Sequence, residues 1–469
     1  MDFLREHKRG VFIFLLALTA RLLFLGVSLQ AHDGNMLKTI WAADDYYEVS
    51  SNVIAGHGYS IDQAPPYTPY AYRPPVYHYF IVGSYFLLGG FWGVILLQIL
   101  LGSLVPLLAM RISQFIIESK KLAIGVGVLL ALEPYSILFS TILYTETFFT
   151  FLFLLSLWCL FAYFKSKKAY LLFLSAFILG LTVLIKPVVQ YLPILFILSI
   201  VWEARGNISK EVLMRAAGYA LFFLLAISPW LYRNYVNFDV VGISPQKGTA
   251  LYFVLVPSVL SLEHTTSFNQ EFQNLTKDFG AGFDLNKLTF ANSDAYEKLG
   301  VTILKSHLGA LSLLSANTGL NFFIHDGMLD VLRHINASPK DRLGGPALFM
   351  LFSAPGELFG FIKKVFMTPA VLILFGRLLW VGITVAFFAG AVRYLRKEKI
   401  TPYGILALSL VFYFMLTTLV VGLAISARYR MPVNIFILLF ALYGLIPLYR
   451  NKVTQSVAQR LKYFYDPQR

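Results

Sequence analysis

The chain has 469 residues, of which 57% are hydrophobic and 14% charged. Several apolar runs approach the ~20 residues that an α-helix needs to cross a bilayer, so the composition excludes a soluble domain and predicts an all-α polytopic membrane protein. The formal charge of +14 does not indicate nucleic-acid binding, because the basic residues recur as short clusters between apolar runs. The single cysteine, Cys159, excludes an intramolecular disulfide and a cysteine metal cluster.

The apolar runs predict about ten transmembrane helices. We interpret the first run as a retained span, because no small-residue cleavage site follows it. The predicted spans lie at residues 11–29, 91–113, 121–138, 147–164, 169–185, 188–203, 213–231, 366–392, 402–424 and 431–448. Short basic loops resist translocation, so the positive-inside rule places the basic clusters and both termini in the cytoplasm. The lack of a disulfide and of an organellar signal favours a bacterial inner (plasma) membrane.

This topology divides the chain into a catalytic membrane module, an outer subdomain, a second membrane part and a tail. The module contains a first outer loop and a short apolar segment, which we expect to form an interfacial helix on the outer face. A second such helix is expected at residues 346–364. The predicted parts are 1–231 (membrane module, with loop 30–75 and interfacial helix 76–90), 232–365 (large extracytoplasmic loop), 366–448 (C-terminal transmembrane helices) and 449–469 (basic cytoplasmic tail).

The first outer loop carries two adjacent acids in the stretch "DDYYEVSSNVIAGHGYS", residues 44–60. An ordinary interpretation is that Asp44 and Asp45 cap the helix predicted to begin near Tyr46, since aspartate is a common N-cap. The aromatic residues and the turn at His57 favour a second interpretation, in which the acids form the floor of a pocket at the membrane surface. Adjacent side chains point apart, so only one acid can face a substrate.

Further charged residues lie at the predicted outer boundary. Glu146 begins a span after an uncharged outer loop, although the helix dipole alone also accounts for an acid there. Basic residues are disfavoured on this side, which makes their presence informative, although each can also anchor the chain by extending to lipid headgroups. The outer cations are Arg73, Lys186, Arg233, Arg428 and Arg430.

Six motifs in this order resemble a known family. They are "DDYYEVSSNVIAGHGYS", "YRPPVYHYF", "SILFSTILYTETFF", "LGLTVLIKP", "PWLYRNYVNF" and "ARYRMP". Together they resemble the GT-C fold integral-membrane glycosyltransferases, in particular the branch of protein O-mannosyltransferases and lipid A aminoarabinose transferases (families 39 and 83). The resemblance is strongest over residues 1–245, returns near Ser426–Pro432 and is absent from the long loop.

The resemblance implies transfer of a sugar from a polyprenyl-phosphate carrier to an acceptor hydroxyl on the non-cytoplasmic face. The acceptor is a protein, lipid or glycan. Asp44 or Asp45 is then the general base, and we favour Asp44, although the family's acid usually lies further upstream of the tyrosine. Glu146 either assists the base or, with Asp44, holds a divalent cation such as Mg²⁺ or Mn²⁺, a cofactor that the sequence leaves open. Tyr46, His57 and the five outer cations are expected to bind substrate or carrier phosphate.

Two other functions share this composition. A transporter or flippase of lipid-linked sugars would also be apolar and rich in outer aromatic residues, but such proteins usually show inverted repeats and ionisable groups at mid-membrane. An oligosaccharide ligase or polymerase would move a longer chain by the same displacement. The expected partners are the lipid-linked donor, the acceptor and membrane lipids, with no nucleic acid.

Overall fold

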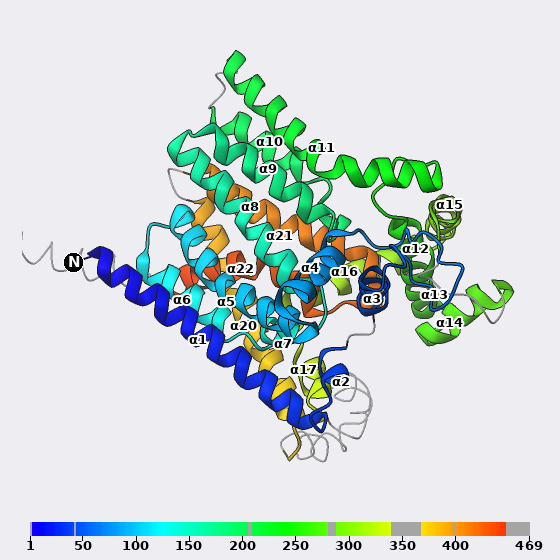
Figure 1. Cartoon of the computed structure of the whole chain (residues 1–469). Helices are drawn as coiled ribbons and strands as arrows, with labels where there is room; N and C mark the ends of the chain where they lie inside the picture. The colour runs from blue at the N-terminus through cyan, green and yellow to red at the C-terminus, as the bar shows by residue number, and fades with distance from the viewer. Residues whose placement is uncertain are drawn as a thin grey trace, which may run out of the picture.

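The computed structural model describes residues 2–41, 44–204, 209–279, 288–338, 367–396 and 400–446. Within these ranges every regular element is a helix (Figure 1). The prediction of an all-α, multi-pass membrane protein is thereby confirmed. The basic tail at 449–469 and the second expected interfacial helix at 346–364 lie outside the described residues.

Six helices in the described part of the chain are long and apolar enough to cross a membrane. They are α1 (Asp2–Ala31, apolar from Lys8), α5 (Phe91–Ile116), α8 (Glu146–Ser166), α11 (Lys210–Phe238), α20 (Ala370–Leu395) and α21 (Pro402–Thr418, continued by a 3₁₀ segment to Ala424). Shorter helices are α4 (Val76–Leu88), α9 (Ala169–Val183), α10 (Leu192–Glu203) and α22 (Asn434–Leu445). The prediction of about ten crossings stays a prediction.

Two further helix pairs would reach eight candidate spans if each crosses once. The pairs are α6 (Lys120–Ala131) with α7 (Pro134–Thr141), bent by 52°, and α15 (Phe290–Ser306) with α16 (Leu308–Ile324), bent by 101°. The first bend lies at Pro134, where a proline cannot continue the preceding helix. Arg21 of α1, which is 1% exposed, donates to the carbonyl of Ala131 at 3.4 Å and so satisfies the interrupted end of α6.

The membrane module is a succession of packed helices. α1 packs on α5 and α6, α5 on α8, α8 on α9, and α9 on α11. In the C-terminal part, α20 and α22 are in close contact. Their backbones approach at Gly390, where an added Cβ would lie 1.8 Å from the carbonyl oxygen of Phe440. Small residues at such a crossing are typical of helices that pack within a membrane.

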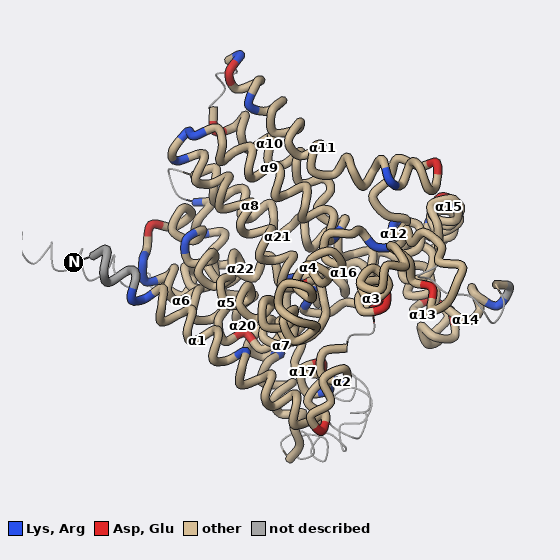
Figure 2. Tube along the Cα trace, in the orientation of Figure 1, with Lys and Arg blue, Asp and Glu red and all other residues tan. Residues whose placement is uncertain are grey.

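Lys and Arg occur at several helix ends. Figure 2 shows them near the start of α1, at the beginnings of α6 and α11 and at the end of α8, and others lie by α12 and α14. The basic ends of α1, α6, α8 and α11 are those that the predicted orientation places in the cytoplasm. The orientation itself stays a prediction.

The expected outer segments are built of short helices. They are α2 (Met36–Ile40), α3 (Tyr46–Ile54), α12 (Gln246–Ala250), the π-helix η2 (Leu251–Leu255), α13 (Val256–His264), α14 (Phe268–Thr276), the 3₁₀ helix η3 (Lys277–Phe279) and α17 (Met328–His334). Figure 1 shows α12 to α15 grouped beside the helical core. α16 differs, because it packs against α20 and α21 and buries Phe322 and Phe323 in the main core. The predicted loop 232–365 therefore includes a helix that contacts candidate spans.

Candidate active site

A cavity of about 270 Å³ lies where the predicted outer motifs meet. Its walls come from segments far apart in the chain: the turn before α3, the loop before α4, the start of α8, the connection after α9, the end of α21 and the 3₁₀ helix η7 (Ala427–Val433). The polar lining residues are Asp44, Tyr46, Arg73, Tyr144, Glu146, Lys186, Gln246, Thr417, Thr418, Arg428 and Tyr429. The structure thus brings together six of the ten residues predicted for the site.

The two adjacent acids have different positions. Asp44 lines the cavity, and its carboxylate lies 3.1 Å from Nη2 of Arg73. Asp45 is 4% exposed and does not line the cavity; it receives a hydrogen bond from Nε of the same arginine. Asp45 precedes α3 but makes no side-chain cap hydrogen bond. The contacts to Arg73, rather than helix capping, therefore account for this pair.

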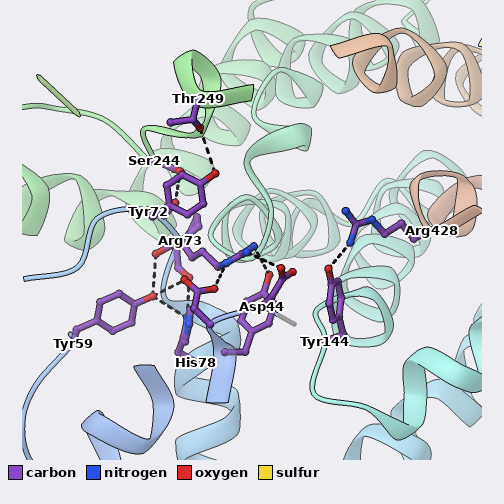
Figure 3. Close-up of polar contacts among 12 residues, drawn as sticks. Asp44, Tyr59, Tyr72, Arg73, His78, Tyr144, Ser244, Thr249 and Arg428 are labelled. Atoms are coloured by element: carbon purple, nitrogen blue, oxygen red, sulfur yellow. Dashed lines mark hydrogen bonds and ion pairs between the residues drawn. The ribbon is translucent and has the colours of Figure 1, made fainter. Parts of the chain in front are cut away.

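Arg73 is held in place by several groups. Its Nη1 donates to the Tyr46 hydroxyl at 3.0 Å, and its guanidinium carbon lies 4.7 Å from the centre of that ring. Pro74 and Pro75 follow directly and restrict the backbone. In Figure 3, Arg73 and Arg428 lie on either side of Asp44. This arrangement presents a fixed guanidinium to the cavity.

The environments of the two acids shift their pKa values in opposite directions. Burial raises the pKa of the Asp44 carboxyl, but Arg73 and the Tyr144 hydroxyl, with smaller contributions from Arg428 and Lys186, hold it below its usual 3.8. Burial raises the pKa of Asp45 to about 6, and Arg73 offsets only part of this effect. Asp44 is therefore ionised at neutral pH and faces the cavity.

Glu146 and Lys186 form a buried ion pair in the same cavity. The Nζ of Lys186 lies 2.5 Å from Oε1 of Glu146, whose side chain is 2% exposed. Thr145 donates to the other carboxylate oxygen at 3.1 Å. Lys186 follows α9 and precedes Pro187, which begins a 3₁₀ turn and directs the chain back. Burial lowers the pKa of Lys186, and Glu146 offsets only part of this.

Arg428 supplies a third cation. It extends from η7 and donates to the Tyr144 hydroxyl, and its Nη2 donates to the Tyr429 hydroxyl at 2.8 Å. Figure 3 shows the contact between Arg428 and Tyr144, whose hydroxyl also helps to lower the pKa of Asp44. The charged groups that line the cavity are thus three cations and two carboxylates, and the adjoining carboxylate of Asp45 also pairs with Arg73.

Arg430 was predicted to bind phosphate, but the structure places it in the core. It is 0% exposed and donates to the main-chain carbonyls of Phe322, Phe323 and His325 at 2.6 to 2.8 Å. These carbonyls lie at the end of α16, where the helix leaves acceptors unpaired. Arg430 therefore connects η7 to α16 by hydrogen bonds and does not line the cavity.

Arg233 and His57 also lie outside the cavity. The guanidinium of Arg233 lies 4.6 Å from the centre of the Trp230 ring and donates to Asn234 at 2.9 Å. His57 is exposed and stacks on Tyr67 with ring centroids 4.1 Å apart. Both residues belong to the six motifs, but their side chains contact aromatic neighbours and not the cavity.

Sequence reasoning missed Tyr144, Tyr429 and Gln246. Tyr144 lies two residues before Glu146, and Tyr429 lies beside Arg428, so the motifs "LYTE" and "ARYRMP" contained the signal. Gln246 carried no such signal, because it belongs to the segment that resembles the family least. It brings the second outer segment to the cavity wall.

The cavity residues do not fit a divalent cation. Asp44 and Glu146, the two acids predicted to hold one, are each paired with a cation, Arg73 and Lys186. Among the described residues no group of three histidine, cysteine, aspartate or glutamate side chains is arranged to bind a metal. A metal here would have to displace both ion pairs and tolerate three nearby positive charges.

A family model for dolichyl-phosphate-mannose-protein mannosyltransferases matches residues 72–232, about a third of the chain. This segment contains Arg73, Glu146 and Lys186, and the predicted resemblance is confirmed there. Comparison with curated proteins by sequence finds no match.

Three solved structures match most of this chain. They are the Archaeoglobus fulgidus oligosaccharyltransferase in complex with Zn and sulfate (12% identity, TM-score 0.45, 95% of this chain and 51% of that chain), AglB from the same organism with an inhibitory peptide and a dolichol-phosphate (14%, 0.45, 94% and 52%), and ArnT from Cupriavidus metallidurans bound to undecaprenyl phosphate (15%, 0.37, 95% and 81%). The chain spans about half the length of the two archaeal proteins. Identities and TM-scores this low do not transfer residues or ligands to this chain.

Proposed function

We propose that this protein is a glycosyltransferase that moves a sugar from a polyprenyl-phosphate carrier to an acceptor hydroxyl on the non-cytoplasmic face. The observation that carries the proposal is the convergence of the cavity-lining Asp44 carboxylate with the cations Arg73, Lys186 and Arg428. Three cations that line one cavity favour a phosphate, and guanidinium groups bind its oxygens by charge-assisted hydrogen bonds. The proposed location is a bacterial inner membrane, with the cavity facing the periplasm.

The proposed reaction is a direct displacement. The acceptor oxygen forms a bond to the anomeric carbon, while the bond from that carbon to the carrier phosphate oxygen breaks and its electron pair remains on the phosphate. The acceptor proton passes to Asp44, which is ionised and able to receive it as the attacking oxygen becomes acidic. Arg73, Arg428 and Lys186 stabilise the charge that develops on the departing phosphate. No step requires a metal.

An apolar groove offers a place for the carrier's hydrocarbon chain. It runs between α10 and α21 and is lined by residues such as Ile194, Leu198 and Phe412. Tyr413, at the groove, donates to the carbonyl of Val188 at 2.5 Å, and Val188 lines the reaction cavity. The groove and the reaction cavity share no lining residue, but this hydrogen bond joins their walls. We propose that the hydrocarbon chain of the carrier lies in the groove.

The second outer segment is proposed to select the acceptor. Gln246 lines the cavity and belongs to this segment. Replacing the whole segment by that of a relative should change which acceptor is used, while hydrolysis of the donor stays intact. An unchanged acceptor would contradict this assignment. A ligase or polymerase that moves a longer glycan would use the same displacement, and the acceptor and donor panels below distinguish it.

Carrier turnover by purified protein in liposomes tests the function. A panel of polyprenyl-phosphate sugars is offered with crude acceptor extract to the wild type, Asp44→Asn and Asp45→Asn. The expected result is free polyprenyl phosphate with the wild type and none with Asp44→Asn, although that variant still binds the carrier. If instead labelled lipid changes leaflet without release of its sugar, and both variants behave like the wild type, the protein is a transporter.

A further inference from the structure

A second apolar groove, with a volume of about 680 Å³, lies between α5 and α8. We call it the α5–α8 groove. Its apolar wall includes Leu104, Leu108, Phe151, Leu155 and Trp158. It shares no lining residue with the reaction cavity or with the groove between α10 and α21. The proposed transfer reaction therefore does not account for it.

One end of the α5–α8 groove is polar and basic. Arg111, Gln114 and Lys165 line this end, and both cations are exposed. Arg111 and Gln114 also line a small adjoining hollow together with Arg9 and Lys120. Two positive side chains thus line one end of the groove, and two more line the adjoining hollow. Figure 2 shows basic residues near the start of α1, at the beginning of α6 and at the end of α8.

The dimensions of the groove match one leaflet of a bilayer. Leu104 and Gln114 are ten residues apart on α5, which corresponds to ~15 Å along a helix at 1.5 Å per residue. This is about half of the ~30 Å hydrocarbon core. The apolar wall therefore begins near the middle of the membrane, and the cations lie near its surface. An acyl chain of an ordinary phospholipid fits this depth, whereas a long polyprenyl chain exceeds it.

We propose that the α5–α8 groove binds one anionic diacyl phospholipid of the leaflet at the basic side, which the positive-inside rule predicts to be cytoplasmic. Arg111 and Lys165 contact the phosphate, Gln114 donates to its oxygens, and the acyl chains lie against Phe151, Leu155 and Trp158. Basic pockets between transmembrane helices are a recurrent binding mode for anionic headgroups. The bound lipid would contact both α5 and α8. The first residue of α8 is Glu146, which lines the reaction cavity.

Native mass spectrometry of delipidated protein measures this binding directly. The protein is titrated with phosphatidylglycerol and with phosphatidylcholine that carries the same acyl chains. Each nearby Lys or Arg contributes about fivefold to the affinity for an anionic lipid, so R111Q/K165Q should lose about 25-fold for phosphatidylglycerol and little for phosphatidylcholine. K168Q/K210Q removes two exposed cations outside the groove and is the matched control, with no expected loss.

Two further measurements keep the outcomes distinct. Leu155→Trp narrows the groove without changing its charge, so it should weaken the binding of both lipids. In a competition experiment, polyprenyl phosphate is added to protein with bound phosphatidylglycerol, to test whether the groove prefers the carrier lipid. The proposal is overturned if the two phospholipids bind the wild type equally, if K168Q/K210Q loses as much as R111Q/K165Q, or if polyprenyl phosphate displaces phosphatidylglycerol at equal concentration.

Discussion

The Glu146 and Lys186 pair allows structural and functional roles to be separated by a double-mutant cycle. The cycle comprises Glu146→Gln, Lys186→Met and the double variant. Each single change leaves one buried charge without its partner. The double change removes both charges and replaces the pair by groups of similar volume.

The magnitude follows from burial and geometry. The carboxylate is 2% and the ammonium side chain 26% exposed, and the two lie 2.5 Å apart. Removing one partner of a buried ion pair costs about 3–5 kcal/mol, whereas replacing both is often close to neutral. We therefore expect each single variant to have a clearly lower apparent melting temperature, and the double variant to recover most of the loss.

Cys159 provides the assay for stability. It is the single cysteine of the chain and is 1% exposed, so a thiol-reactive fluorophore gives a signal only when the core opens. Transfer activity is measured on the same preparations. If Lys186 binds the departing phosphate, the double variant remains at least tenfold below the wild type in turnover even though its stability recovers.

One result would refute this reasoning. If the double variant recovers turnover together with stability, the pair only supports the fold and Lys186 has no role at the phosphate. Lys168→Met, at an exposed lysine away from the cavity, serves as the control for loss of a positive charge and should change neither measurement.

Three further predictions concern the other charged groups. Asp44→Asn should lower turnover by about 10²- to 10⁴-fold, the usual contribution of a general base, while carrier binding in an equilibrium assay is retained. Below pH 6 Asp45 becomes protonated and its ion pair with Arg73 weakens, so wild-type turnover should fall with an acid midpoint near 6. Asp44, with its pKa below 3.8, adds no change in that range, and a pH profile of Asp45→Asn should lack this limb. Arg430→Met unpairs three buried carbonyls at the end of α16 and should lower the apparent melting temperature by more than Arg428→Gln, which should mainly reduce turnover; equal effects on melting would argue against the two roles.

The apolar runs were sufficient to predict the helical class, but not the helix ends. We predicted residues 121–138 as one span, yet the structure divides this segment at Pro134, with Glu133 accepting hydrogen bonds from Ser136 at the start of α7. Hydropathy averages over such a break. The buried Arg21 that completes this bend lies in the first predicted span, where composition gave no sign of its partner more than 100 residues later.

For the site, residue type and order predicted Asp44, Arg73, Glu146, Lys186 and Arg428, because the predicted topology placed all of them at the same boundary of the membrane. The same logic could not separate Arg428 from Arg430. They are two residues apart in η7. The direction of each side chain depends on the local backbone and on the free carbonyl groups at the end of α16, which accept hydrogen bonds from Arg430. Side-chain direction in a short irregular helix is a tertiary property, and hydropathy does not contain it.

The wide spacing of the cavity residues along the chain also bears on biosynthesis. The partner of each acid is synthesised soon after it, since Asp44 and Arg73 belong to the same loop region and Glu146 and Lys186 are 40 residues apart. Arg428 is made last. At ~5–20 residues per second, about 20–80 s separate the synthesis of Asp44 from that of Arg428. The cavity therefore cannot be complete until the C-terminal helices have been made.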